Sequence, residues 1–596
     1  MRIVHMHIQN YRSIKDAEFL LPEDVVLVGD NNSGKSTILE AIDLVLGPDR
    51  MKQRPVIYEH DFYEGQYIKE ESEDCEEVDP IEIRVEATII GLSEEQESRF
   101  LENLEFWDLS EEHIIGEPPV ETTDDENVVS ALRVIFVGSY NEEEDDFEGR
   151  TFFMSPESDT GELEPFRTQD KRYCGFLFLR TLRTGSRALS LEHGSLLDII
   201  LRLREKRVQI WEDVISELRE VGVAENEELG LSATLVEVQE KLRSFIPTEW
   251  ADDPHIRVSD LTRENLRRVL TVFMASGSED EGYAVPFRRQ GTGTINMLVF
   301  ALLSMIADEK QNVIFAMEEP EISIPPYTQK RVIESVKASS SQVLLTSHSP
   351  YVIEEFPPDN VVVLQRSEGS LILIPSSLPP KVKMKAYRRE MRTRFCEALL
   401  ARRVLIVEGR TEYDALPAAS RRLAYLYPGK HRSLDSMGIA VVDAETDSQV
   451  VPLVEYFEKL GKETFAVFDK QDDSTISDAL EHGFESPETG FERLIAKNID
   501  ISVIEEFIDE LIKSNEWPLR ETDKPEDGIG EKELRKLLVK VLKKFKGSGE
   551  AALLIAKCNS AEEMPGFIVE MLSEIQEVVA SEDEESNYEA DDGEEE

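Results

Sequence analysis

The stretch VVLVGDNNSGKSTILEAI, residues 25–42, decides the fold, because a glycine-rich loop joins a short apolar strand to an apolar-periodic helix. The loop has the spacing Gly29-x4-Gly34-Lys35-Ser36. Main-chain amides in such a loop, together with the helix N-terminus, attract phosphate groups, and the lysine reaches the terminal phosphates while the hydroxyl holds Mg²⁺. The expected nucleotide contacts are Asn31, Asn32, Ser33, Gly34, Lys35, Ser36 and Thr37.

A second apolar run, residues 313–317, ends in Glu318, Glu319 and Pro320. Its pattern predicts a buried strand that ends in two carboxylates. We expect Glu318 to hold the Mg²⁺ shell and Glu319 to polarise the attacking water. The pair therefore predicts nucleotide hydrolysis in addition to binding.

Two further segments flank this acidic strand. Gly291 and Gly293 precede an apolar helix at 295–306, whose N-terminus would meet a γ-phosphate across a dimer interface. His348 follows the apolar strand 343–345 and is expected to sense the same phosphate. Together with RIVHMHIQNYRSIKDAEFLL at residues 2–21, these motifs resemble the ABC-type ATPase head shared by SMC-like, RecF-like and OLD-family proteins.

Acids also end three strand-like runs nearer the C-terminus. Glu408 follows residues 403–407, Asp443 follows residues 439–442, and Asp469 follows residues 465–468. Parallel α/β sheets gather ligands at the carboxyl ends of their strands, so these acids are expected to meet there. An oxygen-only site favours Mg²⁺ or Mn²⁺ over zinc, and two ions about 3.5–4 Å apart would suit phosphodiester hydrolysis.

An ATPase head followed by VEGRTE, residues 407–412, and an acid cluster resembles the layout of OLD-family nucleases with a Toprim domain. The resemblance implies Glu408 as a catalytic and metal residue, and Lys546 as an active-site lysine. Asp469 takes the first place of the family's DxD pattern, whereas Gln471 replaces the second acid and Asp472 lies one residue late. The implied metal ligands at this site are Glu408, Glu412, Asp443, Asp469, Asp472 and Glu492.

These motifs predict an α/β chain made of an ABC-type P-loop ATPase head with an inserted helical region, followed by a Toprim domain with helical additions. The insertion is expected to dimerise, because its apolar residues recur at helical spacing. The expected ranges are 1–190 and 256–380 for the head, 191–255 for the insertion, 395–480 for the Toprim core, 481–578 for its helices and 579–596 for an acidic disordered tail.

Composition sets limits on the setting of this chain. It has 596 residues, 40% of them hydrophobic, which suits several folded domains. The four cysteines form no CxxC pair, no leader pattern precedes the first strand, and no apolar run is long enough for a bilayer, so we expect a cytoplasmic protein with no membrane segment. A net charge of -56 opposes DNA binding, but much of it lies in loop-like acidic runs, and basic patches remain at 180–187, 387–394 and 532–546.

Three classes of function remain open. The first is an ATP-controlled, Mg²⁺- or Mn²⁺-dependent DNA endonuclease or nickase in prokaryotic defence against phage or in DNA processing, working as a homodimer or larger homo-oligomer with a possible helicase-like partner. The second is a non-catalytic, SMC- or RecF-like DNA-repair ATPase with a degenerate Toprim fold, which Gln471 keeps open. The third is a topoisomerase or primase, although no separate tyrosine-bearing domain or zinc module is recognisable in the sequence.

Overall fold

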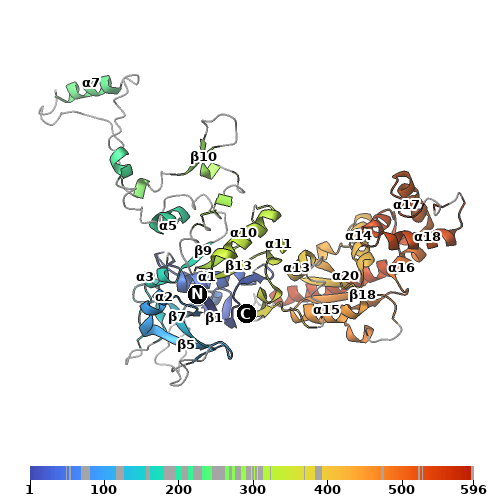
Figure 1. The fold of residues 1–596 in the computed structure, drawn as a ribbon, viewed down its shortest axis with the longest axis horizontal. Helices are drawn as coiled ribbons and strands as arrows, with labels where there is room; N and C mark the ends of the chain where they lie inside the picture. Colours follow the sequence, from blue (N-terminus) through green and yellow to red (C-terminus); the bar gives the residue numbers. More distant parts are fainter. Residues whose placement is uncertain are drawn as a thin grey trace. The chain divides into compact units, whose positions relative to one another are not determined.

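A computed structural model gives the fold shown in Figure 1. The chain divides into two compact units, Met1–Asp24 with Ser36–Thr346 and Val25–Lys35 with Ser347–Glu596. The described residues are 1–31, 33–48, 50–52, 55–68, 81–115, 127–155, 162–179, 195–203, 213–218, 231–243, 262, 264–266, 271–275, 284–289, 291, 297–298, 301–302, 305, 313–322, 324–367, 370–380, 382, 392–471, 476–520, 524–525 and 528–591.

Antiparallel strands dominate the N-terminal part of the first unit. Along the sheet, β2 pairs with β1, β1 with β4, β4 with β7, and β7 with both β5 and β8. The strands are β1 (Arg2–Tyr11), β2 (Ile14–Leu20), β4 (Ile83–Ile90), β5 (Leu104–Asp108), β6 (His113–Ile115), β7 (Val128–Asn141) and β8 (Asp146–Phe153). The alternation of buried and accessible residues along β1 and β2 shows that one face of the sheet packs on the core.

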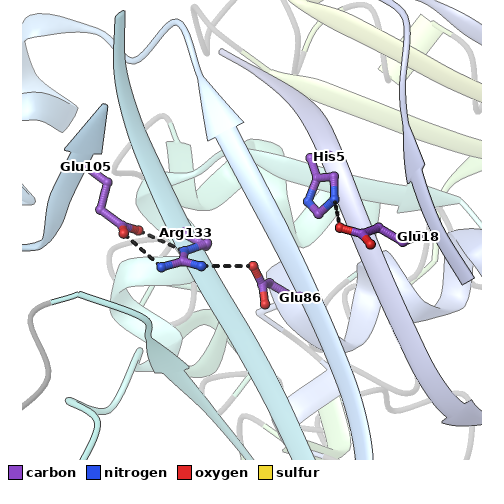
Figure 2. A network of polar contacts seen from close by, with 5 residues as sticks. All are labelled: His5, Glu18, Glu86, Glu105 and Arg133. Carbon is purple, nitrogen blue, oxygen red and sulfur yellow. Dashed lines mark hydrogen bonds and ion pairs between the residues drawn. The ribbon is translucent and has the colours of Figure 1, made fainter. Parts of the chain in front are cut away.

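The other face of this sheet carries cross-strand ion pairs (Figure 2). Arg133 on β7 donates from Nε and Nη2 to the two carboxylate oxygens of Glu105 on β5, at 3.0 and 2.9 Å, and lies 3.5 Å from Glu86 on β4. His5 on β1 contacts Glu18 on β2 at 2.9 Å. Opposed charges on neighbouring strands help to set the strand register.

Another group of strands in the first unit is parallel. Strand β12 (Ile314–Glu318) pairs with β9 (Phe176–Leu179) and with β13 (Gln342–Thr346), both in parallel. All residues of β12 and β13 are buried, and α10 (Pro326–Ser339) contacts β13. Continuous burial of this kind is typical of parallel strands that are covered on both faces.

The loop that binds phosphate in the sequence prediction lies between β3 (Val25–Val28) and α1 (Lys35–Leu46). In the second unit, β3 pairs in parallel with β14 (Val361–Ser367), which pairs antiparallel with β15 (Ser370–Pro375). The short helix α11 (Pro350–Ile353) contacts α13 (Arg392–Leu400).

The C-terminal part of the second unit is built on a four-stranded parallel sheet in the order β17-β16-β18-β19. The strands are β16 (Arg403–Val407), β17 (Ile439–Asp443), β18 (Glu463–Phe468) and β19 (Gly483–Glu485). Leu405, Val407, Phe465 and Val467 face a core shared with α14 (Arg410–Leu426). Because side chains alternate along a strand, the intervening residues face the opposite side, where α15 (Asp447–Lys459) contacts β16 and β18.

The core beside α14 continues into further helices. They are α16 (Phe491–Asn498), α17 (Ile501–Lys513), α18 (Glu531–Lys544), α19 (Glu550–Ala556) and α20 (Gly566–Asp591). Helix α20 continues to Asp591 and so enters the range 579–596, for which the sequence predicts an acidic disordered tail. Glutamate and alanine are good helix formers, so an acidic composition does not by itself end a helix.

The predicted helical insertion lies mostly outside the described residues. Within it the structure describes α5 (Leu196–Leu203) and α7 (Leu231–Arg243). Most of the predicted helix at 295–306 is likewise not described. No helix among the described residues is both long enough and apolar enough to cross a bilayer.

Candidate functional sites

The glycine-rich loop after β3 has the backbone that a phosphate cradle requires. Gly29 and Gly34 have φ values of +153° and +95°, and a β-carbon on Gly29 would lie 2.9 Å from the Leu364 carbonyl oxygen. Only glycine adopts such angles at low cost. The Lys35 ammonium donates to the carbonyl oxygens of Gly29, at 2.9 Å, and Asp30, at 2.6 Å. The Lys35 side chain therefore contacts the loop that is expected to bind the phosphates.

The hydroxyls near this loop differ in their surroundings. Ser33 is buried, and its Oγ has no hydrogen-bond partner among the described residues. Thr37, two residues into α1, lies 3.5 Å from Ser13 Oγ in the turn between β1 and β2. Arg12 in that turn has φ +51° and pairs with Glu40 of α1 at 2.7 Å, which ties the turn to the helix. Sequence reasoning missed this contact, although NYRS precedes the loop in the chain.

The two acids after the strand β12 have different backbones. Glu318 ends β12 and is buried. Glu319 has φ +45°, a left-handed conformation that is strained for a residue with a β-carbon, and its N–H donates to the Thr346 carbonyl oxygen at 2.9 Å. Strain held at an acid just beyond a buried strand is consistent with a functional position.

The remaining head residues are only partly described. His348 is exposed just beyond β13, where the Ser347 N–H donates to the Leu27 carbonyl oxygen of β3 at 3.4 Å. This contact places the histidine segment beside the strand that enters the phosphate loop. Gly291 is exposed. Asn32 and Gly293, both predicted nucleotide contacts, lie outside the described residues.

In the C-terminal sheet, the predicted acids gather at the carboxyl edge. Val407 pairs with Asp443 and with Val467, so Glu408 follows β16 at the level of Phe468, and Asp469 lies one residue beyond that level. The Asp469 N–H donates to Glu408 Oε2 at 2.7 Å. Glu412 lies in the first turn of α14, and Glu492 in the first turn of α16. Asp472 lies outside the described residues.

Burial dominates the electrostatics of this acidic group. Glu412, Asp443 and Glu492 are each about 5% exposed or less. Burial raises the pKa of Glu412 to about 8, and burial also raises the pKa of Glu408, Asp443 and Asp469. A buried carboxylate is costly without a compensating cation, so the arrangement favours a proton or a positive charge at this edge.

Two cations already face the acids. Lys546 Nζ lies 3.8 Å from Glu492, and its charge lowers the pKa of Glu408, Glu412, Asp443 and Asp469 against the larger effect of burial. Arg410 Nε lies 3.7 Å from Asp443. Lys546 therefore lies beside the predicted metal ligands, and its role as an active-site lysine stays a prediction.

The donor set fits divalent ions, although the acids do not form a ready-made cage. Asp469 Oδ1 is buried with no hydrogen-bond partner among the described residues, which leaves an oxygen for a cation. All candidate ligands are carboxylates, the class that Mg²⁺ and Mn²⁺ prefer. Among the described residues, no three potential ligands converge closely enough to hold an ion.

Sequence reasoning missed residues that orient these acids. Thr411 Oγ1 donates to Glu492 Oε1 at 2.8 Å, and both side chains are buried. Asp447, in the first turn of α15, adds negative charge that raises the pKa of Glu408 after the larger effect of burial. Thr411 and Arg410 belong to the VEGRTE motif, so the motif could have indicated that both residues lie at the site. Nothing in the sequence points to Asp447.

Comparison with protein-family models defines the class. The AAA ATPase domain model matches residues 1–130 and 180–353, and the model for the TOPRIM domain of overcoming lysogenization defect (OLD)-like proteins matches residues 399–470. The first model covers about half of the chain. The chain therefore belongs to the AAA ATPase domain family and carries an OLD-like Toprim domain behind its ATPase head.

Individual relatives are distant. The Old nuclease of Escherichia phage P2 is 23% identical over 457 residues, which span 71% of this chain and 70% of that protein. An SMC head bound to the C-terminal winged-helix domain of ScpA matches 63% of this chain and 98% of its own, with 12% identity and a TM-score of 0.35. The SMC head domain from Thermotoga maritima matches 63% and 99%, with 13% identity and a TM-score of 0.28. At these TM-scores the two structures carry no functional conclusion.

Proposed function

We propose that this protein is an ATP-binding and ATP-hydrolysing, divalent-metal-dependent DNA endonuclease or nickase. The observation that carries the proposal is the set of acids at the carboxyl edge of the Toprim sheet, with Glu408 and Asp469 joined there by a 2.7 Å hydrogen bond. The OLD-like domain match and the similarity to a nuclease support the same reaction.

Each group at the Toprim edge has a role that follows from its surroundings. Glu408, Glu412, Asp443, Asp469 and Glu492 would hold two divalent ions, with Asp472 as a further proposed ligand. When bound, such ions activate a water and stabilise the leaving oxygen of a phosphodiester. Thr411 orients Glu492 through its hydroxyl. Lys546 Nζ lies 3.8 Å from Glu492, where it would bind a non-bridging phosphate oxygen of the DNA.

The head would supply control through ATP. We propose that Lys35 and the loop amides bind the phosphates, that Ser36 and Glu318 hold Mg²⁺, and that Glu319 polarises the attacking water. Gly291, Gly293 and His348 would complete the site in a homodimer. We further propose a cytoplasmic setting and a role in prokaryotic defence against foreign DNA, and both rest on the family resemblance.

A second function has one observation in its favour. Gln471 stands where the family pattern has an acid, and its side chain donates to the Asp469 carbonyl oxygen at 3.0 Å. A Toprim fold that had lost its chemistry would serve a non-catalytic DNA-repair ATPase. The described residues give no comparable support to the hypothesis of a topoisomerase or primase.

Plasmid cleavage separates these functions. Purified protein with supercoiled plasmid and Mg²⁺ or Mn²⁺ is expected to give nicked or linear DNA, and Glu408→Ala is expected to abolish both products. Glu481→Gln is a matched control, because this glutamate is exposed before the amino end of β19. Cleavage that survives Glu408→Ala contradicts the nuclease proposal, whereas relaxed closed circles indicate a topoisomerase.

A further inference from the structure

The fourth strand of the Toprim sheet also ends in an acid. Strand β19 pairs in parallel with β18, and Phe468 aligns with Glu485. The Ser486 N–H donates to the Phe468 carbonyl oxygen at 2.8 Å, which holds the end of β19 level with the end of β18. Neighbouring strands lie about 4.8 Å apart, so Glu485 lies beside Phe468, one residue before Asp469, at the same edge of the sheet.

Glu485 also meets the position at which this chain departs from the family pattern. Its Oε1 accepts a hydrogen bond from the Gln471 N–H at 3.0 Å. The Gln471 side chain turns to the Asp469 carbonyl oxygen and offers no negative charge. A carboxylate that contacts Gln471 therefore comes from the neighbouring strand β19.

At this edge, a cation bound by Glu485 could also bind one carboxylate oxygen of Asp469. Asp469 Oδ1 is buried without a hydrogen-bond partner among the described residues, while Glu485 is exposed and can change rotamer at little cost. An acid at 471 would follow Asp469 by two residues, whereas Glu485 reaches the same end of β18 from the side. A carboxylate from Glu485 in place of one at position 471 keeps the total negative charge of the metal ligands the same.

We propose that Glu485 supplies the metal-ligating carboxylate that Gln471 lacks, so that each of the four parallel strands contributes an acid to the Toprim site. The ligand is a divalent cation of the Mg²⁺ or Mn²⁺ type, because all of these donors are hard oxygens. This inference rests on the proposed nuclease function and extends its site to β19. Glu485 acts here as a ligand, and its hydrogen bond to the main chain is secondary.

Metal binding tests the assignment without relying on activity. Free Mn²⁺ is measured by electron paramagnetic resonance during titration of the full-length, nucleotide-free chain, at an ionic strength that screens weak binding to the acidic surface. Glu485→Gln retains an oxygen that can accept the Gln471 N–H but loses the charge. We expect the tightest Mn²⁺ sites to weaken roughly tenfold. Glu481→Gln, the control at the other end of β19, should leave the affinity unchanged.

A compensating substitution makes the test specific. Adding Gln471→Asp to Glu485→Gln should restore the wild-type affinity, because the acid returns to the place that the family pattern gives it. Wild-type affinity in Glu485→Gln would overturn the inference, as would a loss confined to Asp472→Asn. If Glu408→Ala also leaves Mn²⁺ binding unchanged, the proposed nuclease site itself fails. A loss in Glu408→Ala alone overturns only the role of Glu485.

Discussion

The phosphate loop of the head and the acidic edge of the Toprim sheet both follow parallel strands, but main-chain groups form the first site and side chains form the second. The loop after β3 is a main-chain structure, shaped by glycines at φ +153° and +95° and closed by Lys35 on two carbonyl oxygens. The Toprim edge is a side-chain structure, in which burial raises the pKa of several carboxyl groups.

The difference explains how each site would respond to change. A main-chain site depends on backbone angles within one short segment, so its ligand is an anion bound by amides and by one lysine. A side-chain site collects charge from distant segments, so it is electrostatically unfavourable until a cation enters. A substitution that inactivates one site should therefore leave the other site unchanged.

The largest effect is expected at the Toprim edge. Glu408→Ala should reduce DNA cleavage by on the order of a thousandfold, since losing a single charge-stabilising group in an active site costs about 10²–10³ in rate. ATP hydrolysis by the same variant should stay at the wild-type level. Parallel plasmid and phosphate-release assays measure both rates. A matching loss of ATPase activity would show that the sites are not separable.

The converse change is Lys35→Ala in the phosphate loop. Removing the ammonium should reduce ATP hydrolysis by roughly a hundredfold or more, because it removes a phosphate contact in the transition state. Mn²⁺ binding to the nucleotide-free chain should not change, since the metal ligands lie on other strands. Calorimetric titration with Mn²⁺ measures this affinity. Weaker metal binding in Lys35→Ala would show that the phosphate loop and the Toprim metal site depend on each other.

A smaller effect is expected from Thr411→Val. The substitution removes the 2.8 Å hydrogen bond to Glu492 at nearly constant volume. Residues that orient a metal ligand typically contribute tenfold or more in affinity, so we expect Mn²⁺ binding to weaken about tenfold. Thr411→Ser keeps the hydroxyl and should bind Mn²⁺ like the wild type. Equal affinity in the valine and serine variants would show that Thr411 does not orient Glu492.

The smallest effect concerns the helix that follows the phosphate loop. Lys171 is fully buried, its ammonium donates to the Leu44 carbonyl oxygen near the end of α1 at 2.7 Å, and burial lowers its pKa to about 7. Above pH 7 the unfolded chain holds a proton that the folded chain has lost. The free energy of unfolding contributed by Lys171 should therefore rise with pH, by at most about 1.4 kcal/mol per unit, until the unfolded lysine titrates.

Urea unfolding between pH 7 and pH 9, in roughly unit steps, compares wild type with Lys171→Met. The difference in unfolding free energy should shift in favour of the wild type as the pH rises. A constant difference over this range would show that the lysine keeps its proton in the folded head. The chain's other titrating groups are common to both proteins, so the difference isolates Lys171.

Most of the strands that carry the two sites could be predicted from the sequence, because their signals are local. Val25–Val28, Ile314–Glu318 and Arg403–Val407 are short apolar runs bounded by glycine or acid, and each is a buried strand in the structure. The α/β class, the ATPase head and the Toprim domain agree with the family matches. The roles of the individual site residues stay predictions.

The contacts between segments could not be predicted in the same way. Glu408 meets the Asp469 N–H only because β16 and β18 are neighbours, and a pattern within either segment does not contain that fact. Strand β19 has three residues, which is too short to show a period, so nothing in the sequence marks Glu485 as the end of a strand. The extension of α20 to Asp591 was not expected from the sequence, because an acidic composition outweighed helix propensity in the prediction.

Anomalous diffraction from crystals soaked in Mn²⁺ without nucleotide would locate the metal site of the Toprim sheet. We expect Mn²⁺ peaks at the carboxyl edge of that sheet, bounded by Glu408, Asp469 and Glu492, with Glu485 as a further ligand beside β18. The same peaks should be missing from crystals of Glu408→Ala. Crystals of the wild type with no Mn²⁺ at this edge, at a concentration that supports cleavage in solution, would show that these acids do not form the metal site.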